Sequence, residues 1–462
     1  MKTASLYPFQ DRVAEFTENK PRVGIFTFFG SGKTFMSIRW IEQLYLQQRA
    51  PLPVLVLTLK STVGQWGEEI EKHCFRSSSL LTGNIESRLK ALSTPADFYI
   101  VNYDAVRSPR LKKALMQKRF KTVLADESGQ FLKNARTARY AAWRKILKDT
   151  PYRALLTGKV ILERPEDVWS QMLFLDDGES LGTSFWKFRY TYFSPGPPWR
   201  PYEWELKVGA GEKIATLMRR RCIQIKEEDV EIELPPRRDF TIKLKMSSKS
   251  RELYEKLRDD FATELPDGAQ YETKWAMART SKMHQLCQGF LYNDSCDGTK
   301  GTWQEIDGTK IEWLRENLPL MIQNGPVLVW SCFKAMQARI AQMLEEEKIA
   351  YGSIHSELSD SARTQVRLDF TEGKFDVFLL SQQIAAAGLN LQRANQAIFT
   401  CTDYKAALRE NAEKRCRRIG SQIHEHITYY DLIMDKSVDQ AVLLAIKHKT
   451  NIAEEILKHL RE

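Results

Sequence analysis

The sequence predicts an α/β protein of two tandem lobes, each a mainly parallel sheet with helices on both faces. Short apolar runs rich in Val, Ile, Leu or aromatic residues alternate with helical stretches, and this alternation appears in each half of the chain. With 462 residues the chain is also too long for one ordinary core. The expected strands lie at 23–26, 54–58, 98–103, 122–125 and 154–157 in the first half, and at 327–331, 377–381, 397–400 and 427–430 in the second.

A basic segment followed by consecutive prolines separates the two halves. Arg219-Arg220-Arg221 leads through a charged stretch to Pro235-Pro236. Because consecutive prolines stop a helix and stiffen a connection, we expect the boundary near Pro235. The predicted lobes are therefore an N-terminal lobe over residues 1–235 and a C-terminal lobe over residues 236–462.

Two stretches fit neither sheet. Residues 185–204 interleave aromatic side chains with Arg and Lys, within an aromatic and basic insertion expected near 178–210. Their rings can stack on bases or pack on their own lobe, and packing is the favoured interpretation. Residues 290–304 are polar and contain glycine, so they are interpreted as a loop or insertion.

Composition and charge narrow the class of protein. An apolar fraction of 43% with 28% charged residues is typical of a soluble globular chain, and no apolar run approaches the roughly 20 residues that span a bilayer. The net charge of +10 favours polyanionic partners without deciding the matter. The seven cysteines include no CxxC pair, which argues against a zinc module or a disulfide framework and indicates a reducing, intracellular compartment.

The first segment with evident chemistry is Gly30-Ser31-Gly32-Lys33-Thr34, between the strand at 23–26 and a helix expected over 35–45. Backbone N–H groups that converge on a helix N-terminus bind anions. Lys33 would then reach the β- and γ-phosphates of a nucleotide, and the Thr34 hydroxyl would ligate magnesium. The strict pattern begins with Gly, where this chain has Thr27, so a flexible turn is the alternative.

The second segment is Asp126-Glu127, which follows the apolar run 122–125 directly. Carboxylates at the carboxyl ends of parallel strands lie where such sheets bind ligands. Asp126 would hold magnesium through water, and Glu127 would orient and deprotonate an attacking water. An ordinary acidic surface pair is the alternative.

The third segment is the arginine cluster Arg415-Cys416-Arg417-Arg418-Ile419-Gly420. Guanidinium groups offer forked donors to a transition state rich in charge, so one or two of these arginines can act as fingers on a γ-phosphate. From the spacing alone, a solvated surface cluster is the favoured interpretation.

Taken in order, these segments resemble the motor core of the Swi/Snf-type branch of superfamily 2 helicase-like ATPases, in the compact form common in bacteria and their viruses. The resemblance extends over nearly the whole chain. The segments that carry it lie at 6–10, 30–34, 54–66, 101–103, 126–134, 156–167, 327–331, 381–383, 388–391 and 415–420, followed in order from the first lobe to the second.

The resemblance implies two RecA-like lobes with ATP and Mg²⁺ between them. It assigns the adenine to Gln10, adds Ser31 to the phosphate-binding residues Gly30, Gly32, Lys33 and Thr34, and makes Arg415 and Arg418 complete the site from the second lobe. It further implies translocation on double-stranded DNA through backbone contacts, usually without full strand separation. We expect a monomer with no membrane partner, in a prokaryotic or virus-infected cytoplasm, or in the nucleus if the chain is eukaryotic.

The chain departs from the family pattern at positions that couple the γ-phosphate to movement on DNA. These positions are Phe28-Phe29, Gly129-Gln130, Gly158-Lys159-Val160, Ala385-Ala386, Asn411 and Ser421. Two alternatives to an active translocase therefore stand. One is an ATP-regulated DNA-binding clamp with weak or lost motor activity, and the other is a strand-separating helicase.

Overall fold

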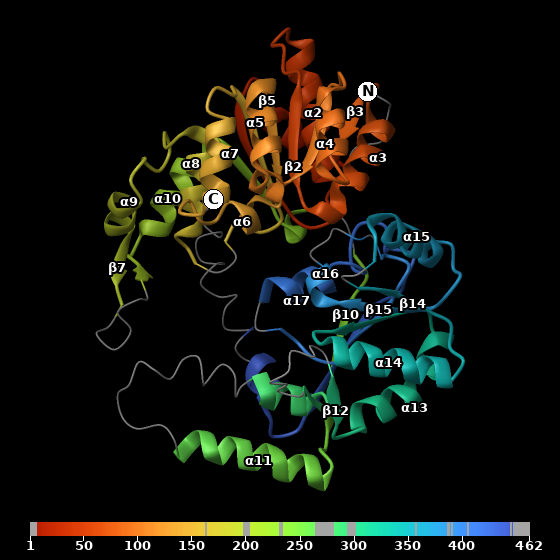
Figure 1. Ribbon diagram of the computed structural model, residues 1–462. Coiled ribbons are helices and arrows are strands. Elements are labelled where there is room, and N and C mark those ends of the chain that lie inside the picture. The colour runs from red at the N-terminus through yellow and green to blue at the C-terminus, as the bar shows by residue number, and fades with distance from the viewer. Residues whose placement is uncertain are drawn as a thin grey trace. The chain divides into compact units, whose positions relative to one another are not determined.

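The computed structural model describes residues 7–161, 164–196, 204–230, 234–263, 281–292, 302–355, 358–385, 389, 391–403, 406–443 and 446. The chain divides into two compact units between residues 232 and 233. Figure 1 shows the first lobe in red to green and the second in green to blue. Gly388, Asn390 and Ala386, which belong to segments quoted above, lie outside the described residues.

The first lobe is built on a parallel sheet of seven strands in the order β3-β4-β2-β5-β6-β1-β9. Every neighbouring pair in this sheet runs parallel. Its strands are β1 (Arg22–Thr27), β2 (Val54–Thr58), β3 (Ser78–Leu80), β4 (Phe98–Asn102), β5 (Thr122–Asp126), β6 (Tyr152–Thr157) and β9 (Cys222–Ile225).

Helices cover both faces of this sheet. Alternate strand residues such as Leu55, Leu57 and Val123 share one core with side chains from several helices, including Phe188 of α9 (Phe185–Tyr192) and residues of five helices on the sheet. These five helices are α4 (Ile85–Ser93), α5 (Pro109–Lys118), α7 (Ala138–Ile146), α8 (Asp167–Asp176) and α10 (Ala210–Arg219). The intervening strand residues are equally buried, and the helices that contact the sheet outside that core are α1 (Pro8–Thr17), α2 (Lys33–Leu46) and α3 (Val63–His73).

The second lobe repeats the plan with a six-stranded sheet in the order β10-β17-β16-β13-β15-β14, again parallel throughout. Its strands are β10 (Arg237–Leu244), β13 (Val327–Ser331), β14 (Tyr351–Ile354), β15 (Val377–Ser381), β16 (Gln396–Phe399) and β17 (Ile427–Met434). Helices α13 (Thr309–Gln323) and α14 (Lys334–Glu346) pack on one face. The opposite face is covered by α15 (Asp360–Thr371) and α17 (Ala406–Glu413). Two further helices are α11 (Ser248–Thr263) and the single turn α16 (Gln382–Ala385).

The predicted fold class of two parallel α/β lobes is confirmed. Both stretches outside the sheets contain more regular structure than the sequence indicated. In the first stretch, α9 (Phe185–Tyr192) is followed by β7 (Phe193–Pro195), which pairs antiparallel with β8 (Trp204–Leu206). The loop interpretation of 290–304 is wrong at its ends, because β11 (Phe290–Tyr292) pairs antiparallel with β12 (Trp303–Glu305). Backbone pairing satisfies the polar groups that a loop would leave to water.

Candidate active site

The loop of residues 28–32, which the sequence predicts to bind phosphate, connects β1 to α2 at the carboxyl edge of the first sheet. Gly30 and Gly32 have φ angles of 80° and 82°, left-handed values that other residues adopt only with strain. Gly32 is the N-cap of α2, so the free N–H groups of the first helical turn point to this loop. Thr27, which stands where the strict pattern has Gly, shares a buried 2.7 Å hydrogen bond with the Ser31 hydroxyl. This hydrogen bond holds the loop in one conformation, which argues against the alternative that the segment is a flexible turn.

Two side chains brace the loop from inside. The Gln10 amide nitrogen donates to the Ser31 carbonyl at 2.9 Å, and a Cβ on Gly32 would lie 2.9 Å from the same nitrogen. The Lys33 ammonium donates to the carbonyl oxygens of Thr27 and Phe28, both at 3.2 Å. Gln10 and Lys33 therefore lie together at the loop, as the sequence predicts, although their roles toward a nucleotide remain predictions.

Asp126 is the last residue of β5, and its carboxylate is held on both oxygens. Oδ2 accepts hydrogen bonds from the Thr58 hydroxyl at 3.0 Å and the Trp66 indole nitrogen at 2.9 Å. Oδ1 accepts from the backbone N–H of Glu127 at 3.0 Å. Three donors to one carboxylate fix its orientation. The alternative of an ordinary surface pair is wrong for Asp126.

Tyr103 fixes the backbone of the same segment. Its hydroxyl donates to the Asp126 carbonyl at 2.7 Å. Burial, together with the neighbouring charges of Asp126 and Glu127, raises the pKa of Tyr103 well above its ordinary value. The phenol therefore stays a hydrogen-bond donor across the physiological pH range.

Glu127 adopts a left-handed conformation with φ 49° and is the N-cap of the short helix α6 (Ser128–Phe131). This conformation reverses the chain at once, so that the strand ends at Asp126 and the helix begins at Ser128. Left-handed residues other than Gly are uncommon and cluster at functional sites. The carboxyl end of β5 thus presents two adjacent carboxylates at one edge of the sheet.

The segment after β6 packs between the loop and the acidic pair. A Cβ on Gly158 would lie 2.6 Å from the Phe29 ring, and a Cβ on Gly129 would lie 2.2 Å from the Lys159 carbonyl oxygen. Both positions require glycine, because the Phe29 ring and the Lys159 backbone occupy the space that a Cβ would need. Sequence reasoning did not assign this packing.

Gln171 on α8 connects the segment after β6 with the segment after β5. Its amide nitrogen donates to the Val160 carbonyl at 2.7 Å, and its amide oxygen accepts from the Ser128 hydroxyl at 3.2 Å. Gln171 is almost fully buried. Because a buried amide needs specific hydrogen-bond partners, a glutamine inside a mainly apolar helix indicates a position where neighbouring segments are joined by hydrogen bonds.

In the second lobe the arginine cluster follows α17. Arg415 is only 3% exposed, so the surface interpretation is wrong for this residue. Its carbonyl accepts from the N–H of Leu391 at 3.2 Å, and Arg417 donates to the carbonyl of Pro235 at 2.9 Å. Gly420 has φ 100°, and a Cβ there would lie 2.6 Å from the side chain of Gln392. The finger roles of Arg415 and Arg418 remain predictions, because they concern a site that both lobes would share.

Arg409 anchors the same helix and was not singled out by the sequence. It pairs with Glu413 at 2.7 Å and with Asp431 on β17, and it lies 3.4 Å from the centre of the Phe399 ring. Burial alone would lower its pKa, but the carboxylates of Asp431 and Glu413 outweigh burial and raise it. This buried network fixes α17 on the sheet and so positions the segment that carries Arg415.

The first-lobe residues fit a nucleotide with magnesium. The loop combines two left-handed glycines, a helix N-terminus and an ammonium group, which is the chemistry that polyphosphates require. Asp126 and the Thr34 hydroxyl supply the oxygen ligands that magnesium prefers. Among the residues that the structure describes, no separate His, Cys, Asp and Glu cluster could hold a metal, and no helix is long and apolar enough to cross a membrane.

Two family profiles match this chain. A SNF2-related domain matches residues 18–293, more than half of the chain, and a helicase conserved C-terminal domain matches residues 309–420. Their succession follows the order of the two lobes.

Individual relatives are similar at low identity. The chain is 28% identical to the putative protein p41 of Acyrthosiphon pisum secondary endosymbiont phage 1, over 85% of this chain and 84% of that protein. It is 24% identical to the ATP-dependent helicase brm of Drosophila melanogaster and 23% identical to the ISWI chromatin-remodeling complex ATPase ISW1 of Saccharomyces cerevisiae. It covers 93% and 94% of itself in these two matches, but only 27% and 38% of the longer proteins.

Among solved structures, the chain is similar to the Sulfolobus solfataricus SWI2/SNF2 ATPase core in complex with dsDNA. That match has a TM-score of 0.43 and 18% identity, and it covers 99% of this chain and 96% of the other. The two domain matches carry the assignment. The chain belongs to the SNF2-related family and is a DNA-dependent, helicase-like ATPase.

Proposed function

We propose that the chain is a monomeric motor that hydrolyses ATP and moves along double-stranded DNA through contacts with the phosphate backbone. One observation carries the catalytic part of the proposal. Asp126, whose carboxylate accepts hydrogen bonds on both oxygens, ends β5, and Glu127 follows it at the same sheet edge as the loop of Gly30 and Lys33. This arrangement supports a carboxylate pair that works on a bound phosphate chain.

In the proposed reaction the loop N–H groups and Lys33 bind the β- and γ-phosphates, and Gln10 recognises the adenine. Thr34 and Asp126 hold Mg²⁺, which neutralises phosphate charge when bound. Glu127 orients a water molecule and accepts its proton as the water oxygen attacks the γ-phosphorus and the ADP oxygen leaves. Arg415 and Arg418 from the second lobe stabilise the charge that develops in the transition state.

The net charge of +10 supports a nucleic-acid backbone as the track. Each phosphate that a protein neutralises releases counterions, so binding and DNA-stimulated hydrolysis should fall steeply with salt. Backbone contacts carry no sequence information, which suits a motor that must move past any sequence.

The test is the ATP hydrolysis rate with duplex DNA, single-stranded DNA and RNA measured in parallel. Duplex DNA should stimulate most, and Lys33→Ala and Glu127→Gln should abolish turnover. The exposed residues Lys72 and Glu68 on α3 provide matched controls, because Lys72→Ala and Glu68→Gln make the same chemical changes away from the loop. Unchanged turnover in Lys33→Ala or Glu127→Gln would contradict the assignment.

The same preparation separates the two alternatives. A clamp would bind duplex DNA in the presence of ATP without releasing phosphate in a single round. A strand-separating helicase would displace a strand from a tailed duplex. A translocase should release phosphate and remove a third strand from a triplex without separating the duplex.

A further inference from the structure

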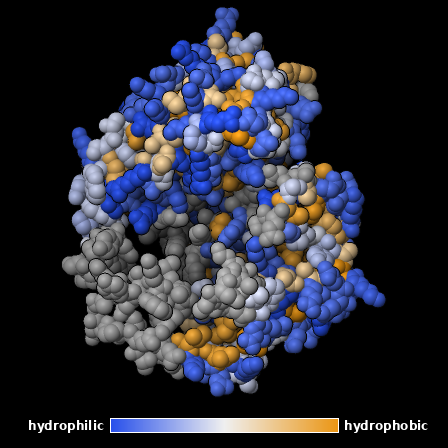
Figure 2. All heavy atoms as spheres, in the orientation of Figure 1, coloured by the Kyte–Doolittle hydropathy of each residue, from blue (hydrophilic) through white to orange (hydrophobic). Residues whose placement is uncertain are grey.

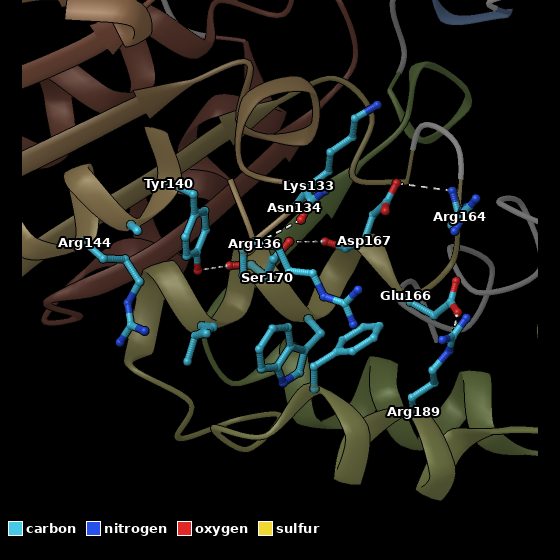
Figure 3. Close-up of a pocket in the computed structure, with 15 residues that line it drawn as sticks. Lys133, Asn134, Arg136, Tyr140, Arg144, Arg164, Glu166, Asp167, Ser170 and Arg189 are labelled. Carbon is cyan, nitrogen blue, oxygen red and sulfur yellow. Dashed lines mark hydrogen bonds and ion pairs between the residues drawn. The ribbon is translucent and has the colours of Figure 1, made fainter. Parts of the chain in front are cut away.

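The first lobe contains a cavity that no residue of the loop 28–34 lines. It has a volume of about 770 Å³ and is enclosed by residues 133–136, α7, residues 164–167, α8 and α9. In Figure 3 the side chain of Arg136 extends toward the unlabelled rings, whereas Lys133 points away from them. A cavity of this size accommodates a small organic ligand or one nucleotide.

Two exposed aromatic side chains on α9, Trp186 and Tyr190, form a platform outside the cavity, next to the lining residue Arg136. Trp186 and Tyr190 are 50% and 59% exposed, and their rings stack with centroids 6.1 Å apart and 28° between planes. The spacing of four residues brings both rings to one face of the helix. Figure 2 shows residues of intermediate hydropathy over α9, where Figure 1 locates this helix. By contrast, Phe188 is buried in the lobe and accounts for the packing that the sequence predicted for this stretch.

Guanidinium groups border the platform. Arg136 lies 5.6 Å from the centres of both the Phe185 and Trp186 rings. Arg189 lies 4.1 Å from the Trp204 ring and pairs with Glu166 at 3.1 Å, and Arg144 pairs with Asp177 at 3.5 Å. Within the described part of the chain, Arg136 has ring contacts but forms no ion pair with a carboxylate. It is therefore the cation that an incoming anion would meet beside the rings.

We propose that one unpaired nucleotide of DNA binds at the edge of this cavity, with its phosphate on Arg136, which lines the cavity, and its base on the exposed rings of Trp186 and Tyr190 next to Arg136. The proposal rests on the DNA motor function and narrows its substrate to duplexes that contain an unpaired base. Every base offers a π face, so stacked rings beside a guanidinium suit single-stranded nucleic acid of any sequence. An acidic peptide would use the cations but leave the exposed ring faces uncovered, so a nucleotide is the better fit.

The cavity is joined to the catalytic edge through α8. Ser170 lines the cavity, and its hydroxyl donates to the Leu132 carbonyl at 2.6 Å. The next residue, Gln171, contacts Ser128 and Val160 as described above. A nucleotide that fixes α8 would therefore also fix the segments around Glu127. We expect gapped DNA to stimulate ATP hydrolysis more than fully paired DNA.

The experiment uses the full chain and two labelled duplexes, one fully paired and one with a five-nucleotide gap. Binding is measured by fluorescence anisotropy and ATP hydrolysis by phosphate release. The variants are Trp186→Ala with Tyr190→Ala, and Arg136→Gln. The controls are Phe75→Ala, which removes an aromatic side chain 80% exposed in the same lobe, and Arg110→Gln, whose side chain is 62% exposed on α5.

Wild type should bind the gapped duplex about tenfold more tightly than the paired one, and the aromatic double variant should lose this preference. The controls should keep it, and circular dichroism should show unchanged folding because both rings are largely exposed. An unchanged preference in the double variant would overturn the proposal. If Arg136→Gln instead abolishes binding of labelled poly-glutamate while the gap preference persists, the cavity takes an acidic protein segment and the nucleotide assignment is wrong.

The same measurements show whether the nucleotide site or the motor function is the proposal that fails. If no DNA stimulates hydrolysis but the ring-dependent gap preference remains, the motor proposal fails and the nucleotide site stands. If paired DNA stimulates hydrolysis and the gap has no effect in wild type, the motor stands and the nucleotide site is refuted.

Discussion

The indole N–H of Trp66 donates a 2.9 Å hydrogen bond to Oδ2 of Asp126 and so joins two segments that are 60 residues apart in the chain. Trp66 is buried on α3, and Thr58 at the end of β2 donates to the same oxygen. The carboxylate proposed to hold magnesium is therefore oriented by neighbours from two other elements. Such supporting partners tune affinity for a metal almost as strongly as the ligands themselves.

Replacement of Trp66 by Phe should raise the magnesium concentration needed for half-maximal ATP hydrolysis about tenfold, because Asp126 loses one of its orienting donors. The free energy of unfolding should fall by roughly 1.5–3 kcal/mol, the range for a hydrogen bond to a charged group. Trp40→Phe is the matched control, since Trp40 is also buried and donates from its indole to a carbonyl, that of Lys20, at 3.1 Å. Equal magnesium dependence in both variants would contradict the positioning role.

Gly32→Ala should eliminate ATP binding as well as destabilise the loop. The backbone there has φ 82°, and the new Cβ would meet the Gln10 amide nitrogen at 2.9 Å. Gly209→Ala is the control, because Gly209 has a similar φ of 70° and no atom lies within 4 Å of a new Cβ there. Its loss of stability therefore measures the left-handed backbone strain alone, about 1–2 kcal/mol. Binding of a fluorescent ATP analogue and denaturant unfolding should therefore separate the variants. Retained ATP binding in Gly32→Ala would show that this contact is dispensable.

The stability of the first lobe should depend on the ionisation of Asp177. Burial raises the pKa of this carboxyl, but Arg153, Arg22 and Arg144 outweigh burial and lower the pKa below its ordinary value. A lowered folded pKa adds stability that is complete above the unfolded pKa of about 4 and is lost as pH falls through the folded value. The unfolding temperature of Asp177→Asn should lie below that of wild type at pH 7, and the gap should close on acidification. Replacement of the exposed Asp149 by Asn is the control, and a gap independent of pH would refute the linkage.

In the second lobe, Lys310→Met should destabilise strongly. The Lys310 ammonium is 1% exposed, pairs with Asp439 at 2.9 Å and donates to the Thr400 carbonyl at 2.5 Å. Loss of one member leaves a buried charge alone, at a cost of about 3–5 kcal/mol, and Lys310→Met with Asp439→Leu should recover part of it. Lys374→Met, which breaks an exposed pair with Asp369, should change the denaturant midpoint little. A double variant less stable than Lys310→Met would contradict this account.

The sequence predicted the central strands of both sheets but not their edge strands. Each strand expected from an apolar run lies inside a sheet, whereas the missed strands are β3 and β9 in the first lobe and β10 and β14 in the second, the two edges of each sheet. Edge strands are paired on one side only, and these four are short or polar, so they lack the continuous apolar run that marks a central strand.

In the candidate site, too, some residues could be predicted from the sequence and others could not. The positions of Lys33, Asp126 and Glu127 were predictable because the loop before Lys33 and the pair Asp126-Glu127 each come at the end of a strand, and so at the carboxyl edge of a parallel sheet. The contacts of Trp66 and Gln171 were not, because they depend on which side chains the packed helices bring together. The burial of Arg415 was hidden for the same reason, since a run of arginines reads as solvated until the neighbouring sheet is known.

The hydrogen bond between the Thr27 and Ser31 hydroxyls has a consequence for how such loops diverge. In this chain a hydrogen bond between two side chains fixes the backbone at Thr27, where the strict phosphate-loop pattern has glycine. A residue other than glycine is therefore compatible with this loop conformation. We expect substitutions at positions 27 and 31 to be correlated among relatives, with a hydroxyl lost at one position whenever it is lost at the other. Searches that require glycine at the first position would overlook these ATPases, whereas the paired hydroxyls would identify them.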